Sequence, residues 1–293
     1  MKKLLFLSLV LFGLLSAAIA QDSISPGEIR LLVRGDDMGF CHAANLGCIE
    51  SYKFGIMRSV ELMVPTPWFM EAVRMLNENP GLDVGIHLTL TSEWSNLKWR
   101  PLTPAKSIVD SNGYFFPMVW PNKNLPPNNS IHETDWKMKD IERELRAQIE
   151  LALEQVPHIS HLSNHMGFTS LDPKIKQLVE NLAEEYGLAV EIYDDSFKRF
   201  PGWEDAITLQ QRIDYFAWNL ERLEPGTYLF VDHPAKDTPE MRSVFHKGYE
   251  NVAEDREWVT QVFTSAKILV TVKESNIRLI SYKDLIKMKM DIK

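Results

Sequence analysis

The chain has 293 residues, of which 45% are hydrophobic and 25% charged, the composition of an ordinary globular protein with a sizeable core. Its formal net charge of -8 argues against a nucleic-acid partner, because no basic stripe is available to neutralise phosphates. The length fits one α/β domain of barrel size or two smaller domains.

The first 20 residues have the three parts of a secretory signal peptide. Residues 1–3 carry positive charge, residues 4–15 are apolar, and residues 18–20 form an A-x-A cleavage site. The apolar run is too short to span a bilayer. A buried N-terminal helix is the alternative. We predict a signal peptide over residues 1–20, a mature domain over residues 21–293, a secreted or periplasmic location, and no membrane span after cleavage.

An apolar run ending in two acids follows. Residues 29–34 are typical of a strand buried in a parallel sheet, and the run stops at Gly35, before Asp36 and Asp37. In parallel α/β folds, functional groups collect at the carboxyl ends of the strands. Adjacent carboxylates repel each other unless a cation or a shared proton stabilises them. A metal site is one hypothesis, and an acidic turn that caps a helix is the other.

Cys41 and Cys48 are the only cysteines. A disulfide is an option in an exported protein. If residues 41–52 are helical, however, seven residues separate the two side chains by about 10 Å along the axis, beyond the reach of a bridge. We therefore predict two buried free thiols.

Helical and strand patterns alternate along the remaining chain. Predicted helices cover residues 41–55, 68–79, 136–156, 172–187, 209–223 and 254–266. Predicted strands cover residues 59–65, 82–91, 158–167, 188–195 and 227–234, and residues 277–285 supply a last strand and the start of a terminal helix. In residues 82–91 the apolar side chains alternate with Gly85, His87 and Thr89, so His87 is expected to face the lumen. This alternation predicts an α/β fold with a single irregular, TIM-barrel-like (β/α) barrel.

Residues 91–135 lack regular periodicity and are rich in aromatic residues, among them Trp94, Trp99 and Trp120. A long irregular stretch in a compact domain is usually functional or disordered, and this aromatic density argues against disorder. We interpret it as a loop insertion. Its tryptophans either stack on sugar rings, as substrate-binding residues, or form a small core over the barrel.

Polar groups recur at four predicted strand ends: Asp36 with Asp37, His87, His165 and His233. Equivalent positions in the strand–helix repeat converge on one rim of a barrel. One carboxylate and two imidazoles, with positions left open for water, are a common catalytic metal arrangement. Each histidine taken singly is better explained as a structural or solvent-exposed residue; the metal hypothesis depends on all four positions together.

The other histidines have less support from the pattern. His165 is favoured over His158 and His161 because it lies at the end of its strand. Three more histidines fall in helix or loop stretches and are predicted to be surface residues without acidic or histidine partners: His42, His132 and His246.

Four motifs, RGDDMG (34–39), GIHLTLT (85–91), HLSNH (161–165) and DHP (232–234), resemble in order and spacing those of the ChbG/YdjC-like carbohydrate deacetylase family. The resemblance covers residues 29–285. It implies an irregular (β/α) barrel like that of polysaccharide deacetylases. It also implies a divalent metal ion, Zn²⁺ or Mg²⁺, bound by Asp37, His87 and His165, with Asp36 as general base and His233 as general acid.

Ser163 and Asn164 depart from that family's pattern, which has an Asp-Ser pair there, so a carboxylate partner for a ligating histidine is missing. The expected function is a secreted metal-dependent hydrolase that removes acetyl groups from N-acetylated sugars or small oligosaccharides. The alternatives are a non-catalytic sugar-binding barrel and a metal-dependent phosphohydrolase. The oligomeric state is left open, with a homodimer among the alternatives.

Overall fold

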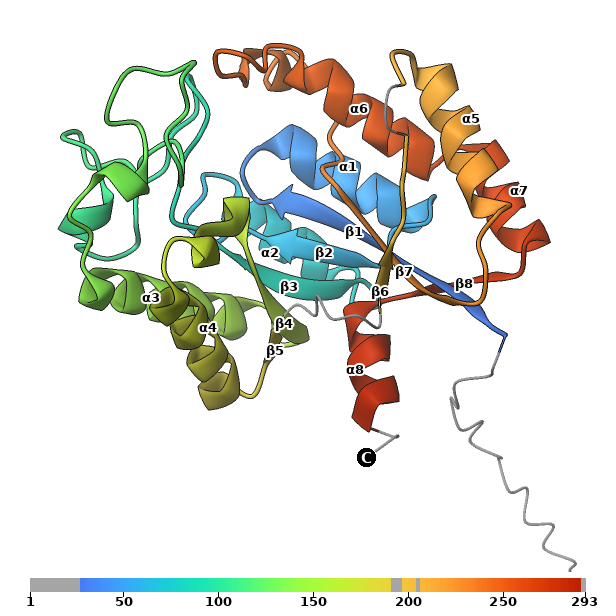
Figure 1. Cartoon of the computed structure of the whole chain (residues 1–293), viewed down its shortest axis with the longest axis horizontal. Coiled ribbons are helices and arrows are strands. Elements are labelled where there is room, and N and C mark those ends of the chain that lie inside the picture. Colours follow the sequence, from blue (N-terminus) through green and yellow to red (C-terminus); the bar gives the residue numbers. More distant parts are fainter. Residues whose placement is uncertain (1–26, 191–196, 204–205, 291–293) are drawn as a thin grey trace, which may run out of the picture.

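Eight parallel strands form one curled sheet in the computed structural model, which describes residues 27–190, 197–203 and 206–290. The strand order is β5-β4-β3-β2-β1-β7-β6, and β8 pairs with the first half of β1 (Figure 1). The strands are β1 Ile29–Met38, β2 Ser59–Leu62, β3 Asp83–Leu88, β4 Ile159–Asn164, β5 Ala189–Val190, β6 Phe197–Arg199, β7 Gly226–Asp232 and β8 Ile277–Ile280. Among the described residues no pairing joins β5 to β6, so this sheet is a half-barrel of the predicted α/β class.

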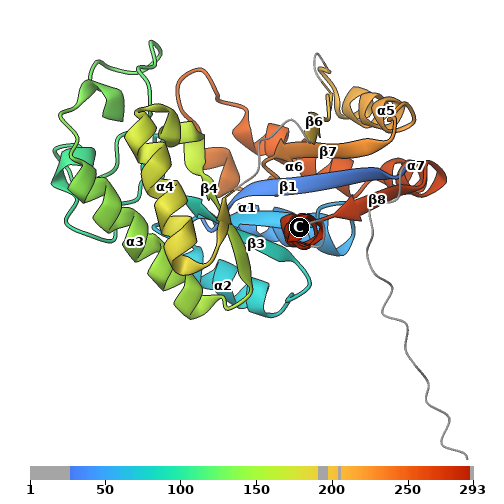
Figure 2. The same cartoon turned by 60° about the horizontal axis from the view of Figure 1, so that its bottom comes forward.

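Helices follow most of the strands; most of them cover the outside of the curl, and the last one packs against its inner face. They are α1 His42–Lys53, α2 Phe69–Asn77, α3 Met138–Gln155, α4 Pro173–Tyr186, α5 Leu209–Leu220, α6 Val252–Phe263, α7 Ala266–Glu274 and α8 Tyr282–Met290. Figures 1 and 2 show α3 and α4 beside β3–β5, and α7 beside β8. None of the helices in the described part of the chain is long and apolar enough to cross a bilayer.

The predicted elements agree with most of this architecture. The predicted strand over residues 188–195 is described only at β5, since residues 191–196 lie outside the described part. Residues 277–285 form β8 and the start of α8, as predicted. Strand β6 and helix α7 were not predicted. The predicted signal peptide also lies outside the described residues.

Residues 89–137, between β3 and α3, contain two short 3₁₀ helices, Lys106–Ile108 and Ile131–Glu133, and no longer element. The segment extends away from the sheet on the side where α3 lies (Figure 1). Both cysteines are buried and free, as predicted. Cys41 begins α1 as its N-cap, and its Sγ accepts a hydrogen bond from the Ala44 amide.

Side-chain alternation along β1 separates two apolar clusters. Leu31 and Val33 belong to the large core between the sheet and the helices. Leu32 belongs to a smaller cluster with residues of β7, β8 and α8, including the fully buried Tyr282. Because side chains alternate along a strand, Arg34 and Asp36 lie on the same inner face as Leu32. The inner face therefore becomes polar toward the carboxyl end of the strand.

Gly85 allows two charged side chains to meet across β3. In the sheet register Gly85 lies between Glu61 of β2 and His161 of β4. Glu61 Oε1 and His161 Nε2 are 2.8 Å apart, and both residues are fully buried. A Cβ atom at position 85 would lie 2.3 Å from Glu61 Oε2 and 2.5 Å from His161 Nε2. The absence of a side chain at position 85 therefore leaves room for this ion pair.

We predict that Gly85→Ala lowers the free energy of unfolding by about 1–3 kcal/mol, because the added methyl group separates a buried ion pair. Denaturant unfolding followed by circular dichroism measures the loss. In a His161→Ala background the same substitution should lower the free energy of unfolding less, because the ion pair is already absent and Glu61 no longer has to stay close to a partner across β3. Equal costs in the two backgrounds would contradict this explanation.

Candidate metal centre

The turn at the end of β1 fixes the position of Asp37. Asp37 has a φ of 68°, a left-handed conformation that interrupts the alternation of side chains along the strand. Asn45 of α1 accepts a hydrogen bond from the Gly39 amide at 2.7 Å and donates to Glu71 of α2 at 3.0 Å. These bonds tie the turn to both helices, so the Asp37 carboxylate is held at the carboxyl edge of the sheet.

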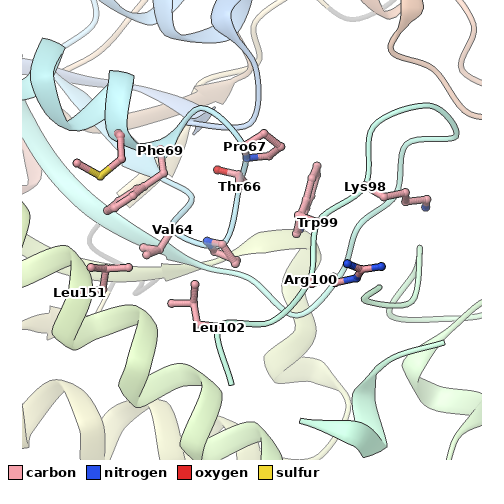
Figure 3. Close-up of a pocket in the computed structure, with 11 residues that line it drawn as sticks. Val64, Thr66, Pro67, Phe69, Lys98, Trp99, Arg100, Leu102 and Leu151 are labelled. Carbon is pink, nitrogen blue, oxygen red and sulfur yellow. The ribbon is translucent and has the colours of Figure 1, made fainter. Parts of the chain in front are cut away.

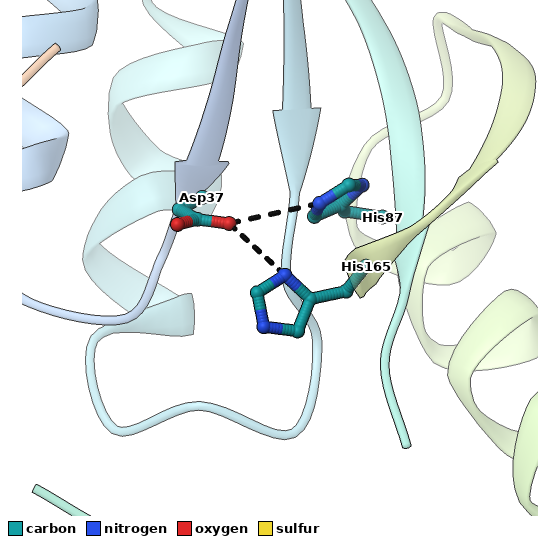
Figure 4. A group of neighbouring side chains, drawn as sticks. All are labelled: Asp37, His87 and His165. Carbon is teal, nitrogen blue, oxygen red and sulfur yellow. Dashed lines mark ion pairs between the residues drawn. The ribbon is translucent and has the colours of Figure 1, made fainter. Parts of the chain in front are cut away.

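Three side chains from β1, β3 and the turn after β4 point toward one another (Figure 4). Asp37 Oδ1 lies 3.6 Å from His87 Nε2 and 3.2 Å from His165 Nδ1. All three donor atoms lie within 4.8 Å of one another, and all three residues are buried. Donor atoms that share a tetrahedral metal at about 2.0–2.1 Å are roughly 3.4 Å apart. The observed spacing therefore suits a small cation.

The second carboxylate oxygen of Asp37 is occupied by Arg256 of α6. Arg256 Nη2 lies 2.9 Å from Asp37 Oδ2, and the guanidinium group is packed over the rings of Phe40 and Trp94. Asp37 Oδ1 is buried and accepts no hydrogen bond from the described residues. Burial raises the pKa of Asp37, but Arg256, His233 and His165 lower it well below its usual range. An ionised carboxylate thus offers one free oxygen to a cation.

The two imidazoles have opposite electrostatic environments. Burial lowers the pKa of His87 to about 4, so this ring is neutral at pH 7, the state that binds metals. Burial also lowers the pKa of His165, but the carboxylates of Glu93 and Asp37 raise it more, to about 10. A cation that binds at Nδ1 must therefore displace a proton from His165.

Asp36 is adjacent to this group and is held by Arg34, two residues earlier on the same face of β1. Arg34 Nε lies 2.7 Å from Asp36 Oδ1, and Arg34 Nη2 lies 2.9 Å from Asp36 Oδ2. Asp36 Oδ2 is also 3.8 Å from the metal-facing Nε2 of His87. A carboxylate fixed by two bonds beside the candidate cation position can accept a proton there.

His233 follows β7 and lies on the open side of the group. Its Nε2 atom is 3.8 Å from Asp37 Oδ2, and 39% of its side chain is exposed. Burial lowers the pKa of His233, but the charge of Asp37 and the contact with Asp232 raise it overall. The structure thus brings all five predicted residues to one edge of the sheet.

A model of the family described as YdjC-like protein matches residues 30–274. The chain belongs to the YdjC-like protein family. Two similar proteins are carbohydrate deacetylase 1 of Listeria innocua serovar 6a, 28% identical over 276 residues, and the carbohydrate deacetylase of Listeria monocytogenes serotype 4a, 29% identical over 269 residues. Each alignment covers 88% of this chain and all of the relative.

A crystal structure described as a cellobiose-phosphate cleavage protein of Enterococcus faecalis V583 has the same fold. The two chains superpose with a TM-score of 0.68 at 22% sequence identity, over 88% of this chain and 99% of the other. The predicted resemblance to the YdjC-like family is therefore confirmed, along with its α/β fold.

The three tryptophans named from the sequence differ in exposure in this YdjC-like protein. Trp94 is 2% exposed, with the Arg256 guanidinium over its ring and His246 stacked on it at 5.6 Å. Trp99 is 3% exposed, and its Nε1 atom donates to the Thr91 carbonyl. Trp120 is 44% exposed and donates from Nε1 to Ser170 Oγ, in the turn that begins with His165. Of these three, only Trp120 has an exposed ring, and His132 lies beside it with 4.6 Å between the ring centroids.

Trp99 also lines a groove on the outside of the sheet (Figure 3). The groove has a volume of about 470 Å³ and lies between the start of α2, residues 98–102 and Leu151 of α3. None of the three metal-facing residues lines it. The groove is therefore separate from the candidate metal centre.

The prediction for His42 is wrong in one respect. His42 Nδ1 lies 2.9 Å from Glu71 Oε2, because α1 and α2 pack side by side, so this histidine has an acidic partner. His132 and His246 lie against the rings of Trp120 and Trp94.

Sequence reasoning also missed Arg256, Glu61 and Glu93. Arg256 and Glu93 contact Asp37 and His165 directly, and Glu61 contacts Ser163, the partner of His87. Glu61 left a usable signal, since a lone acid within the apolar residues 60–64 is expected to have a buried partner.

Proposed function

We propose that this YdjC-like protein is a secreted, metal-dependent hydrolase that removes acetyl groups from N-acetylated sugars or small oligosaccharides. One observation carries the proposal: Asp37 Oδ1, His87 Nε2 and His165 Nδ1 converge within 4.8 Å of one another, beside a second fixed carboxylate. The names of the Listeria relatives support a carbohydrate substrate. The signal-peptide pattern of residues 1–20 supports export.

The residues fit a divalent cation, because one ionised carboxylate oxygen and two ring nitrogens are buried and face a common point. When bound there, such an ion polarises a carbonyl group and lowers the pKa of a coordinated water. Two imidazoles and one carboxylate suit Zn²⁺, whereas Mg²⁺ prefers more oxygen ligands. We therefore favour Zn²⁺ and retain Mg²⁺ as the alternative.

Asp36 is the proposed general base. It accepts a proton from the attacking water while Arg34 holds its carboxylate in place through two hydrogen bonds. The water oxygen forms a new bond to the acetyl carbon, and the bond between that carbon and the sugar nitrogen breaks. Acetate and a free amino sugar are the products.

His233 is the proposed general acid, which gives a proton to the departing nitrogen. Its raised pKa keeps more of the ring protonated near neutral pH, and its partial exposure leaves the ring accessible to substrate. The exposed ring of Trp120, which bonds Ser170, and the 40% exposed Met166 of the same turn are the proposed surface for a sugar ring. Trp94 and Trp99 act in this proposal as packing residues around the site.

The proposal is tested with the purified mature chain, residues 21–293. Acetate release is measured over a panel of N-acetylated saccharides, before EDTA, after EDTA, and after addition of Zn²⁺ or Mg²⁺. We expect activity that EDTA removes and one of the two ions restores. Sugar binding without acetate release would favour the non-catalytic barrel, and phosphate release from sugar phosphates would favour a phosphohydrolase.

A further inference from the structure

The outer nitrogen of each metal-facing imidazole has its own buried partner. His165 Nε2 lies 3.1 Å from Glu93 Oε2, and Glu93 is 6% exposed. His87 Nδ1 lies 2.8 Å from Ser163 Oγ, whose hydroxyl group donates to the fully buried Glu61. The His165 ring is therefore bonded directly to a carboxylate, and the His87 ring is connected to one through a hydroxyl group.

These contacts determine which ring nitrogen carries a proton. The ionised Glu93 carboxylate can only accept, so Nε2 of His165 holds a proton and Nδ1 is left for a cation. The Ser163 hydroxyl has one proton, which it donates to Glu61, so it accepts from Nδ1–H of His87. Once a cation has displaced the Nδ1 proton of His165, the nitrogens with free lone pairs are Nε2 of His87 and Nδ1 of His165, the two that face Asp37.

We infer that Glu93 and Glu61 are positioning residues of the metal centre: Glu93 orients His165, and Glu61 orients His87 through Ser163. Hydrogen bonding of the outer nitrogen fixes the tautomer and ring orientation and makes the inner nitrogen a stronger ligand. Glu61 compensates for the carboxylate that the HLSNH motif lacks, because it reaches Ser163 of β4 from β2, across the intervening strand β3. The inference depends on the metal site of the proposed function, but not on the substrate.

The electrostatic setting supports this role. Burial raises the pKa of Glu61, but His161 and Arg34 lower it to about 2, so the carboxylate is ionised at neutral pH. Arg34 Nε lies 3.8 Å from Glu61 Oε1 while it holds Asp36. Glu61 thus also contacts the residue that positions the proposed base.

The test measures the dissociation constant of Zn²⁺ by competition with a chromophoric chelator, without substrate. Glu93→Gln keeps the shape of the side chain but loses the charge, and Ser163→Ala cuts the contact between Glu61 and His87. We expect Zn²⁺ affinity to fall about 10- to 100-fold for each variant. Glu144→Gln is the matched control, because Glu144 is a fully buried acid whose carboxylate accepts from the backbone amides of residues 102 and 103. The Zn²⁺ affinity of this variant should equal that of the unsubstituted protein.

A second readout separates positioning from general stability. Nitrogen NMR shifts of the imidazoles report the tautomer of the neutral ring, and in that form Glu93→Gln should increase the population of His165 with its proton on Nδ1. Affinities within twofold of the unsubstituted protein for both Glu93→Gln and Ser163→Ala would overturn the inference, as would a protein that binds no Zn²⁺. If both substitutions weaken Zn²⁺ binding as expected but the unsubstituted protein releases no acetate, only the proposed function is overturned.

Discussion

Asp36→Asn is expected to lower kcat for acetate release by about 10²- to 10⁴-fold while the protein keeps its bound metal. The amide cannot take the proton of the attacking water. Metal binding should survive, because the metal-facing atoms belong to Asp37, His87 and His165. The amide also turns an N–H group toward one of the Arg34 nitrogens, which now hold the carboxylate at 2.7 and 2.9 Å, so some stability is lost as well.

The control must lose stability in the same way without touching the site. Asp83→Asn serves this purpose, because Asp83 is a buried acid at the amino end of β3 that binds Ser59 and Ser160. We expect Asp83→Asn to lower the melting temperature with kcat unchanged. Metal analysis, kcat and melting temperature are measured for both variants. Unchanged kcat in Asp36→Asn, with the metal still bound, would remove the base assignment.

The sequence predicted the positions of the metal-facing side chains well, because the face to which a strand residue points depends only on its place in the local alternation. The alternation in residues 82–91 placed His87 on the inner face, as the structure confirms, since Val84, Ile86 and Leu88 lie in the outer core. The strand ends likewise placed Asp37 and His165 on one edge. These predictions needed only the period of two along a strand and the direction of a parallel sheet.

The partners of those groups depend on register and packing, which a single sequence does not contain. Glu61 reaches Ser163 and His161 because β2, β3 and β4 pair with Gly85 between them. Arg256 lies in a charged stretch of helix, where periodicity alone gives no sign that its guanidinium is buried over Trp94.

Helix α7 was missed for a related reason. Residues 266–274 are rich in β-branched side chains, which disfavour a helix, yet packing against α5 and β8 stabilises one. The sequence left two roles open for Trp94, because the residues that cover its ring, among them Phe40 and His246, come from other parts of the chain. In both places tertiary contacts decide what the local pattern does not.

Asp37→Asn is expected to remove both the metal and the activity. Asparagine tolerates the left-handed backbone at this position, where φ is 68°, so the substitution tests the charge rather than the turn. Without the carboxylate, Arg256 is left as a buried cation without an anion at 2.9 Å. Breaking a buried ion pair in this way costs about 3–5 kcal/mol, so the free energy of unfolding should fall by that order.

A double variant separates the loss of metal from the loss of stability. Asp37→Asn with Arg256→Met replaces the ion pair by a neutral amide and an apolar side chain that fits over Phe40 and Trp94. We expect most of the stability to return, because the unpaired charge is gone, while Zn²⁺ binding and acetate release stay absent. Denaturant unfolding, metal analysis and acetate release measure the three quantities. If Zn²⁺ binding returned together with stability, Asp37 would be a structural partner of Arg256 and not a metal ligand.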